Sequence, residues 1–493
     1  MNATNLADLF QSAARAHGDR EAIIDVDRTY TYRELDAVVD RTAAHLLGLG
    51  VGPGDRLGLC LIDNADYLIV MIAAWRIGAI VVPVDWRSKG SERQAVVDRF
   101  DISLVIEHRP PMEIGGYPSA RLDTAWHEAV VRTAPVPAAA TRHDDSVAIL
   151  TLSSGTTGQS TGFPATHRGI HARNKIIQAN CGIGEGTRLL LTLPLNFSVA
   201  RIHAIACLVA GGTVIHHGPM IVVDRLCAMV RRHAVSHLCM VPNMVRTLLY
   251  AAPKDRPLLP ELDCLMCLGA ILPAAEKCAA KERVCPNFYE SYGASSGGPI
   301  TYLRPEDIPD HAESVGRAGI DIDVQVVDED DLPSPADEIG LLRYRSASTA
   351  VNQDAVDAAA VTTEIVKDGW HYPGDLARID KDGFVYIVGR TADIIIRGGG
   401  NIYPVEIENV LAAHPAVEEA AVVAWESPEL GEEVAAFVVL REATDKADLT
   451  AWCRRNLGPA KQPRDIFFRD TMPRNTNGKI LKRELKAELP PIG

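Results

Sequence analysis

The sequence has no excess of positive charge, and this lack excludes a large class of functions. Its 493 residues include 50 Lys and Arg against 64 Asp and Glu, a formal net charge of −14 at pH 7. A general nucleic-acid binder needs a basic surface to neutralise phosphates, so we expect no nucleic-acid partner. Any smaller polyanion would have to be held by local hydrogen-bond donors rather than by the overall field of the protein.

Long apolar runs and a secretion signal are also lacking. The best apolar run, residues 67–75, stops at Arg76 and is too short to span a bilayer. The chain reaches Asp8 without the cationic start and apolar core of a signal peptide. We therefore expect no membrane span.

Paired cysteine motifs are nearly absent. The ten cysteines are scattered, and only Cys264 and Cys267 form a CxxC pair. This pair lies in an apolar run without a second pair or flanking histidines, which favours a buried strand over a metal or redox site. Dispersed free thiols suit a reducing compartment, so we expect a cytoplasmic protein.

The chain does contain short apolar strands that alternate with helical segments. The strands are continuous apolar runs, as expected when helices cover both faces of a parallel sheet. This alternation indicates an α/β fold with layered sheets. The expected strands are residues 147–152, 189–193, 235–241 and 264–268, and clear helices are residues 32–47 and 224–233.

The length fits two or three domains rather than one simple core. An Ala/Pro-rich stretch at residues 133–141 is typical of a surface linker inside the larger domain. After Arg390 the pattern changes to strand, helix, strands, helix and a basic tail. We place the boundary there, with a large multi-subdomain N-terminal domain of residues 1–390 and a small mobile α+β domain of residues 391–493.

A segment rich in hydroxyls and glycine directly follows the strand expected at residues 147–152. Glycines allow a tight turn that presents backbone N–H groups, and the hydroxyls add donors that suit phosphate oxygens. Such a cluster alone is more often a flexible loop, and it is not a P-loop of the GxxxxGK[ST] type. The segment consists of Ser153, Ser154, Gly155, Thr156, Thr157 and Gly158.

Two strand-to-turn junctions combine an aromatic ring with glycines. One contains Tyr292, Gly293 and Ser295, and the other contains Gly269, Ala270 and Ile271. An aromatic face beside a glycine that permits close approach suits a purine base. Each short piece alone is equally well explained as a plain junction between a strand and a turn.

Residues 369–408 bring an isolated acid, an isolated base and a glycine-rich turn into one window. Near the C-terminus, Gly478 precedes Lys479, and a lone Gly-Lys pair there is usually a solvated turn. Pro404 suits the first turn of a helix, with Val405, Ile407, Val410 and Leu411 facing inward. The window contains Gly374 with Asp375, Gly389 with Arg390, and the turn Gly398, Gly399 and Gly400.

In this order along the chain, the segments resemble the motifs of the adenylate-forming superfamily, of the acyl-CoA synthetase and carboxylic acid–CoA ligase type. The resemblance covers roughly residues 6–485. It implies an enzyme that activates a small carboxylic acid as an acyl-adenylate, transfers the acyl group to CoA and releases AMP and pyrophosphate. The implied cofactors are ATP, Mg²⁺ and CoA.

The resemblance also implies a role for each segment in binding the nucleotide. The segment from Ser153 to Gly158 would hold phosphates, and Tyr292 and the segment from Gly269 to Ile271 would enclose the adenine. Asp375 and Arg390 would hold the ribose hydroxyls. Ser295 would meet the α-phosphate.

Lys479 is implied as the catalytic residue. It would reach the reacting carboxylate and the α-phosphate, where a compact ammonium counters the negative charge that builds as two anions approach. The small domain would then turn about Thr391 and Ala392. This rotation would bring the turn Gly398 to Gly400 to the site, where its glycines leave room for a pantetheine arm.

Two positions depart from the family pattern. Thr161 stands where a Lys would meet the outer phosphates, and Ser296 stands where a Glu would help to hold Mg²⁺. These departures keep open the alternative of a weakly active nucleotide-binding relative, although the presence of Lys479, Asp375 and Arg390 weighs against it.

The acid pocket is implied around Asn196, Phe197 and Gly293. Relatives that activate amino acids carry an Asp near this position, and Phe197 disfavours an α-amino acid as substrate. Arg201 and His203 are candidates for polar groups of the pocket, with positions on the helix surface or behind the pocket as the alternative. The choice of acid, and of CoA or a separate carrier protein as acceptor, stays open.

Overall fold

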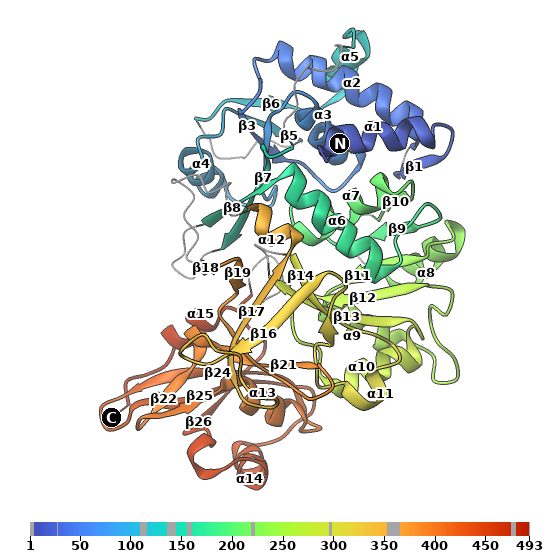
Figure 1. The fold of residues 1–493 in the computed structure, drawn as a ribbon. Coiled ribbons are helices and arrows are strands. Elements are labelled where there is room, and N and C mark those ends of the chain that lie inside the picture. The colour runs from blue at the N-terminus through green and yellow to red at the C-terminus, as the bar shows by residue number, and fades with distance from the viewer. Residues whose placement is uncertain are drawn as a thin grey trace.

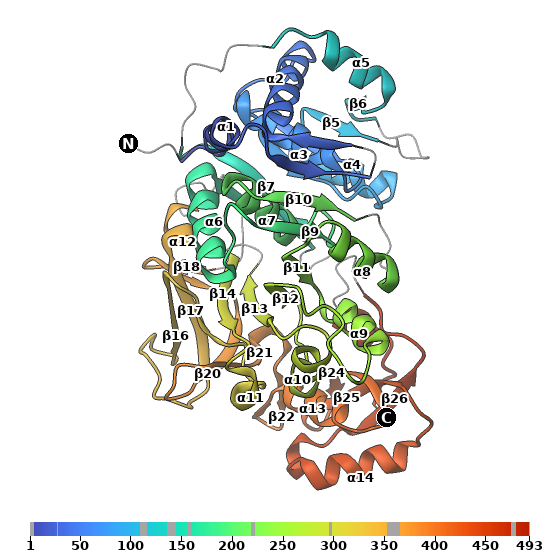
Figure 2. The same cartoon turned by 90° about the vertical axis from the view of Figure 1, so that its right-hand side faces the viewer.

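The computed structural model describes residues 4–26, 28–108, 116–135, 144–154, 160–217, 222–294, 298–352, 365–474 and 480–492. Their strands form four sheets with helices packed between and around them (Figure 1). The sheet formed by residues 395–469 lies at one end of the molecule, and a view turned by 90° shows the same arrangement (Figure 2). The chain is thus an α/β protein with a large body of layered sheets and a small C-terminal part.

The largest sheet, sheet A, has nine strands and is mainly parallel. All its neighbouring pairs from β13 to β1 run parallel, whereas β14, β15 and β2 are antiparallel edge additions. In spatial order its strands are β15 (Arg317–Ala318), β14 (Gly298–Leu303), β13 (Phe288–Ala294), β12 (Cys264–Leu268), β11 (His237–Met240), β9 (Arg188–Leu191), β10 (Thr213–His216), β1 (Glu21–Ile24) and β2 (Thr29–Thr31). The helices between these strands are α6 (His167–Cys181), α7 (Ser198–Val209), α8 (Val223–Arg232), α9 (Pro242–Ala251), α10 (Ala274–Arg283) and α11 (Ile308–His311).

A second sheet, sheet B, has six strands and packs with its helices against the first. Its order is β6 (Ser119–Arg121), β5 (Leu104–Glu107), β3 (Arg56–Cys60), β4 (Ile80–Pro83), β7 (Val147–Ser154) and β8 (Ser160–Thr166). Strands β6 to β7 are parallel, and β8 returns antiparallel. Its helices are α2 (Tyr32–Gly48), α3 (Ala65–Arg76), α4 (Gly90–Arg99) and α5 (Thr124–Arg132), and α1 (Leu6–Ala16) lies beside α2 and α3.

One hydrophobic core joins sheets A and B. It contains residues of α1, α2, α3, α6 and α7 together with strands of both sheets. Every residue of α3 except Asp66 is buried, which explains the apolar run that ends at Arg76. Trp75 on this helix donates a hydrogen bond from Nε1 to the carbonyl oxygen of Ala148 in β7, 2.9 Å away. The helix is therefore a central layer, and none of the described helices is long and apolar enough to cross a membrane.

Two smaller sheets complete the fold. Sheet C consists of β18 (Ile365–Lys367), β19 (Trp370–Tyr372), β17 (Gly340–Ser346), β20 (Asp375–Ile379) and β21 (Val385–Arg390), with β16 (Ile322–Val327) paired to β17 and α12 (Ala347–Asn352) following it. Sheet D consists of β23 (Gly400–Ile402), β22 (Ile395–Arg397), β25 (Gly431–Leu440) and β24 (Val417–Ser427), with β26 (Asp465–Arg469) on β25. Its helices are α13 (Pro404–Ala412), α14 (Lys446–Asn456) and α15 (Lys482–Ala487).

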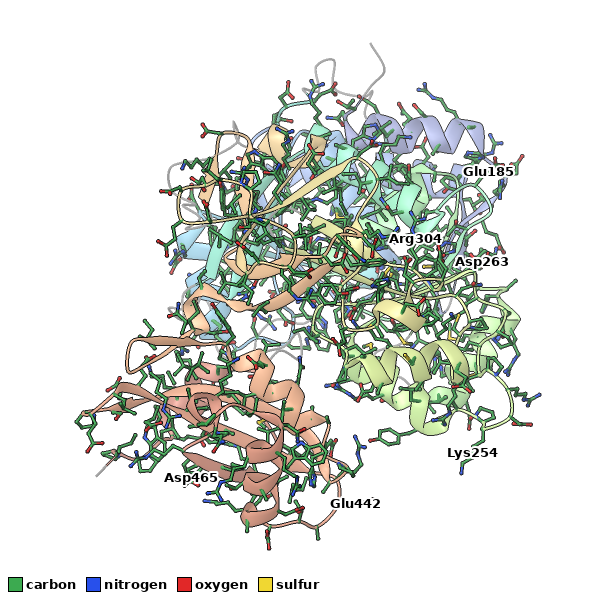
Figure 3. All side chains as sticks on the ribbon, turned by 60° about the horizontal axis from the view of Figure 1, so that its bottom comes forward. Glu185, Lys254, Asp263, Arg304, Glu442 and Asp465 are labelled. Atoms are coloured by element: carbon green, nitrogen blue, oxygen red, sulfur yellow. The ribbon has the colours of Figure 1, made fainter. Side chains whose placement is uncertain are left out.

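Sheet D has hydrophobic clusters of its own. The residues of two clusters all lie after Ile394, and they include Ile407 and Leu411 from α13. Val405 and Val410 on the same helix are only partly buried, so the inward face is narrower than predicted. In Figure 3, Glu442 in this part and Lys254 in the large part point away from the body of the molecule. The exact boundary between residues 390 and 391 stays a prediction.

The predicted elements are present with small shifts in their ends. The strand expected at residues 189–193 is β9, and the strand expected at 235–241 is the shorter β11, in which all four residues are buried. The two expected helices are α2 and α8. Residues 136–141 of the expected linker lie outside the described part of the chain. The ends of the expected strands differ from the observed ends because apolar residues continue past the hydrogen-bonded ladder into the turns.

The CxxC pair lies in a buried strand, as predicted. All residues of β12 are buried, and all ten cysteines are free thiols. Burial raises the pKa of both Cys264 and Cys267 well above the usual value, so these thiols stay protonated and unreactive.

A buried ion pair fixes β13 to α10. Lys277 and Glu290 are 2% and 3% exposed, and the Lys Nζ lies 2.5 Å from the Glu Oε2. Lys277 also donates to the carbonyl oxygen of Ser314 at 2.8 Å. Burial raises the pKa of Glu290, while the charge of Lys277 opposes this shift.

We predict that Lys277→Met destabilises the protein by about 3–5 kcal/mol at neutral pH, because it leaves a buried carboxylate without its cation. Without Lys277 the pKa of Glu290 rises further above its unfolded value, so the penalty is present at neutral pH and fades as the carboxyl becomes protonated. Urea unfolding should show the gap to the wild type narrowing as the pH falls toward about 4.3, the ordinary pKa of a glutamic acid.

The matched control is Lys277→Met combined with Glu290→Gln, which removes both charges and should recover most of the lost stability. A gap that is independent of pH, or a double variant as unstable as the single one, would contradict this interpretation of the pair.

Candidate nucleotide and acid site

The carboxyl ends of the parallel strands of sheet A bring several predicted segments to one edge. Asn196 and Phe197 follow β9, the segment from Gly269 to Ile271 follows β12, and Tyr292 lies near the end of β13. These strands are parallel, so their carboxyl ends share one edge. In open α/β sheets this edge is where ligands bind.

Three predicted residues meet directly at this edge. Asp375 in β20 and Arg390 in β21 are opposite each other in the antiparallel ladder. Arg390 donates from Nε to Oδ1 of Asp375 at 3.0 Å, and the hydroxyl of Tyr292 donates to the other carboxylate oxygen. A residue of sheet A thus joins two residues of sheet C.

The hydroxyl of Tyr292 is held in its protonated form. Burial is the main cause that raises its pKa well above the usual value, and the charge of Asp375 adds to the effect. A phenol that stays protonated can donate to a carboxylate over the whole physiological pH range.

The backbone before Asp375 has a conformation that favours glycine. Gly374 has φ of +79°, which is left-handed. Its carbonyl oxygen accepts hydrogen bonds from the backbone N–H of Thr391 at 3.0 Å and from the Thr391 hydroxyl at 3.1 Å. The turn that presents Asp375 is therefore tied to the 3₁₀ turn η2 (Thr391–Asp393), which leads into sheet D.

Asp375 retains hydrogen-bonding capacity although it is buried. It is 5% exposed, whereas Arg390 beside it is about half exposed. Each carboxylate oxygen has two lone pairs and accepts only one of the hydrogen bonds described above. The carboxylate can therefore also accept from the two hydroxyls of a ribose, as charge-assisted hydrogen bonds. The residues present fit a nucleotide sugar.

Gly293, the residue after Tyr292, permits a close approach of two strands. A Cβ atom at this position would lie 2.4 Å from the carbonyl oxygen of Gly298 in β14. A larger residue would force β13 and β14 apart and shift the ring of Tyr292.

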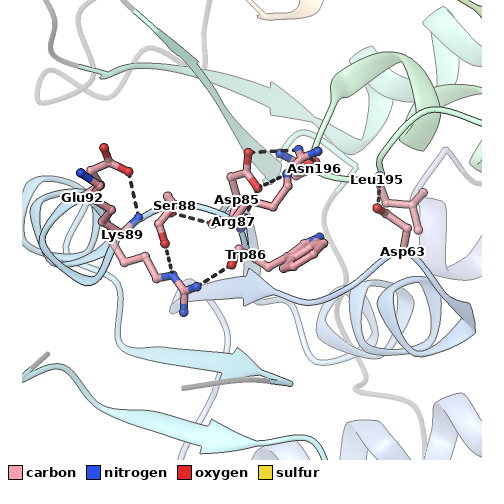
Figure 4. Close-up of polar contacts among 10 residues, drawn as sticks. Asp63, Asp85, Trp86, Arg87, Ser88, Lys89, Glu92, Leu195 and Asn196 are labelled. Carbon is pink, nitrogen blue, oxygen red and sulfur yellow. Dashed lines mark hydrogen bonds and ion pairs between the residues drawn. The ribbon is translucent and has the colours of Figure 1, made fainter. Parts of the chain in front are cut away.

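The carboxyl edge of sheet B faces the segment that follows β9 (Figure 4). Asp63, shortly after β3, accepts a hydrogen bond from the backbone N–H of Leu195 at 2.5 Å. Arg87, shortly after β4, lies 5.7 Å above the ring of Phe197 and 3.5 Å from Oδ1 of Asn196, and it is oriented by Asp85. The two sheets thus hold the predicted pocket segment between them.

Sequence reasoning missed Asp63 and Arg87. The available signal was a charged residue three or four positions after each of two buried parallel strands, where carboxyl ends gather. It was weak because charged residues in loops are common.

Arg201 and His203, both on α7, are buried at 2% and 8% exposure, so the interpretation as helix-surface residues is wrong. His203 bonds to the carbonyl oxygen of Val199 on its own helix. Arg201 instead reaches the carbonyl oxygen of Leu195, which belongs to the pocket segment.

The other predicted residues do not take part in the contact between Tyr292, Asp375 and Arg390. Gly398, Gly399 and Gly400 form the exposed turn between β22 and β23 in sheet D, and Ala270 and Ile271 are exposed. Ser153 and Ser154 end β7. Gly155, Thr156, Thr157, Gly158, Ser295, Ser296 and Lys479 lie outside the described residues.

Comparison with known proteins identifies the family. The model of the AMP-binding enzyme family matches residues 10–351, and that of the AMP-binding enzyme C-terminal domain matches residues 406–479. The chain belongs to the AMP-binding enzyme family.

Several relatives match this AMP-binding enzyme over nearly its whole length. A feruloyl-CoA synthase of Amycolatopsis sp. is 31% identical over 472 residues, which cover 92% of this chain and 93% of the relative. The o-succinylbenzoate CoA synthetase of Bacillus subtilis, in complex with its acyl-adenylate intermediate, is 26% identical with a TM-score of 0.85 and covers 97% of each chain. The same synthetase with ATP and magnesium ion gives a TM-score of 0.84 at 26% identity, with 97% and 99% covered.

These comparisons confirm the predicted family, the α/β fold and the class of AMP-forming carboxylic acid–CoA ligase. They also agree with the predicted use of ATP, Mg²⁺ and CoA. The roles of the individual residues stay predictions.

We predict that Asp375→Ala weakens ATP binding about tenfold to a hundredfold, because each hydrogen bond to a charged group contributes roughly 1.5–3 kcal/mol. Calorimetric titration with ATP measures this effect. The matched control is Asp382→Ala, which removes an exposed carboxylate from the turn between the same two strands. Unchanged ATP affinity in Asp375→Ala would contradict the ribose assignment.

Proposed function

We propose that this AMP-binding enzyme holds ATP at the carboxyl edge of sheet A and there converts a carboxylic acid into its acyl-adenylate. The observation that carries the proposal is the contact of Tyr292, Asp375 and Arg390. It places a buried carboxylate with free acceptor capacity at a ligand-binding edge, beside an exposed guanidinium.

In this proposal Asp375 and Arg390 bind the ribose of ATP. The adenine lies between Tyr292 and the segment from Gly269 to Ile271. The triphosphate extends toward the segment from Ser153 to Gly158, which begins with the last two residues of β7, and Ser295 would reach the α-phosphate. The support is positional, since β7 ends at the carboxyl edge of sheet B, and this edge contacts the segment after β9 through Asp63 and Leu195.

Magnesium would be bound mainly through the nucleotide. Among the described residues, no group of three or more His, Cys, Asp or Glu is placed to hold a metal ion. Mg²⁺ is commonly held by substrate phosphates and water with only one or two carboxylates, so such a site needs no cage of protein ligands.

The acceptor half of the reaction involves the C-terminal part. We propose a boundary after Arg390, a catalytic Lys479, and a rotation about Thr391 and Ala392 that brings the turn Gly398 to Gly400 to the site. The support is that the turn after Arg390 is exposed and short, whereas sheet D has its own core. A part with its own core can move as a rigid unit.

The acid is proposed to bind beside Asn196, Phe197 and Gly293. Arg87 and Asp63 hold the segment that contains Asn196 and Phe197 in place. An aromatic ring at Phe197 favours a substrate without an ammonium group. Feruloyl-CoA synthase and o-succinylbenzoate CoA synthetase, named for aromatic acids, are among the relatives. The thiol acceptor is proposed to be CoA in a cytoplasmic setting, which the ten free thiols support.

A pyrophosphate-release screen over carboxylic acids with ATP and Mg²⁺ tests this proposal. One or more acids should release pyrophosphate, and addition of CoA should yield the acyl-CoA with AMP. Thioester formed on a phosphopantetheinylated carrier protein but not on CoA would select the carrier-charging alternative. Tight ATP binding without pyrophosphate release from any acid would contradict an enzymatic role.

We predict that Lys479→Ala slows adenylate formation by roughly 10²–10³ or more, because it removes a charged donor from a developing anion. Thioester formation from a pre-made acyl-adenylate should remain near the wild-type rate, since Lys479 serves only the first half-reaction. Single-turnover assays of the two half-reactions make the comparison. The control is Lys486→Ala, which removes another lysine of the C-terminal part, on α15. An equal loss in both halves would contradict the assignment of Lys479 to one conformation.

A further inference from the structure

A small cavity lies between the helices of sheet A and the last strands of sheet B. Most of its wall is apolar and consists of Trp75, Ile149, Ala165, Ile170, Ile202 and Ile205. Its polar lining comes from Thr151, Ser198, Arg173 and Arg201. Two guanidinium groups in one mostly apolar cavity are unusual, because taking a charged group out of water is costly.

Both guanidinium groups are deeply buried. Arg173 on α6 is 3% exposed and Arg201 on α7 is 2% exposed. Arg201 donates from Nη1 to the carbonyl oxygen of Leu195 at 2.7 Å, while its Nε is buried and has no hydrogen-bond partner among the described residues. Among the residues that the structure describes, no Asp or Glu forms an ion pair with Arg201.

The electrostatics of the cavity favour an anion. Burial is the main cause that lowers the pKa of both Arg173 and Arg201, and the groups that oppose it are the tyrosines Tyr344 and Tyr67. A carboxylate in the cavity would offset this cost and accept from the unused donor. The N-terminus of α7 adds to the effect, because Phe197 at its N-cap position offers no side-chain hydrogen bond and Ser198 lines the cavity.

The cavity is next to three segments of the proposed active site. Thr151 lies three residues before the end of β7, which corresponds to about 10 Å along a strand. Arg201 holds Leu195 of the acid-pocket segment. A Cβ atom on Gly298 would lie 2.7 Å from Nε of Arg173, so this side chain lies against the start of β14, beside the Tyr292 hairpin.

We propose that the acid substrate carries a second carboxylate, and that Arg201 together with Arg173 binds this second carboxylate in the cavity while the first one reacts. The inference rests on the proposed function and names its substrate class, a dicarboxylic acid with a short hydrocarbon body. The cavity has a volume of about 20 Å³, which suits the carboxylate group alone, so the hydrocarbon body would lie between the cavity and the reacting carboxylate. The guanidinium groups would select the distal charge.

The test compares dicarboxylic acids, in a series from malonate to suberate and including aromatic diacids, with the monomethyl ester of each. Each pair differs in one charge and hardly in length. The wild type should have a higher kcat/KM for at least one diacid than for its monoester. Arg201→Met should lower kcat/KM for that diacid about tenfold to a hundredfold and leave the monoester nearly unchanged.

Two further variants accompany this measurement. Arg201→Lys keeps the charge and should retain part of the preference for the diacid. Arg232→Met removes an exposed guanidinium from α8 and should leave both substrates unaffected. If Arg201→Met does not fold, the preference of the wild type and the effect of Arg201→Lys still decide the question.

The outcomes separate the two proposals. If monocarboxylic acids yield acyl-CoA and every monoester equals or exceeds its diacid, the ligase proposal holds and the second-carboxylate site is wrong. Equal losses for diacid and monoester in Arg201→Met also overturn it, because they indicate a purely structural role. If no acid of either kind releases pyrophosphate, both proposals are overturned.

Discussion

The contact of Tyr292 with Asp375 is the interaction on which the proposed site depends. It joins the carboxyl edge of sheet A to sheet C, and Arg390 adds a second donor to the same carboxylate. A buried carboxylate needs such donors, because an uncompensated charge would be expensive. The same contact places a strong acceptor where the parallel strands end. The carboxylate of Asp375 therefore serves both the stability of the fold and the proposed binding of the ligand.

The position of Asp375 also links the site to sheet D. Gly374 accepts two hydrogen bonds from Thr391, the first residue after Arg390. A ribose bound on Asp375 and Arg390 would thus contact strands that end where the connection to the small part begins. This arrangement gives the nucleotide a direct physical route to influence the orientation of that part.

Charge is distributed differently at the surface and inside. The chain carries a net charge of −14, yet the proposed ligands are anions. The structure resolves this contrast through individual buried or half-buried guanidinium groups, those of Arg87, Arg173, Arg201 and Arg390. In a water-poor setting a single fixed donor acts more strongly than many screened surface charges.

Local patterns in the sequence determined the strands, the helices, the order of the motifs and hence the family. Continuous apolar runs such as β12 are visible without coordinates, because burial on both faces leaves no polar positions. Tertiary structure alone decided that Arg201 is buried rather than on a helix surface, that Asp63 and Arg87 hold the segment after β9, and that Tyr292 reaches Asp375 across 83 positions. The physical reason is that hydropathy and propensity act over a few neighbouring residues, whereas these contacts arise only when separate sheets pack edge to edge.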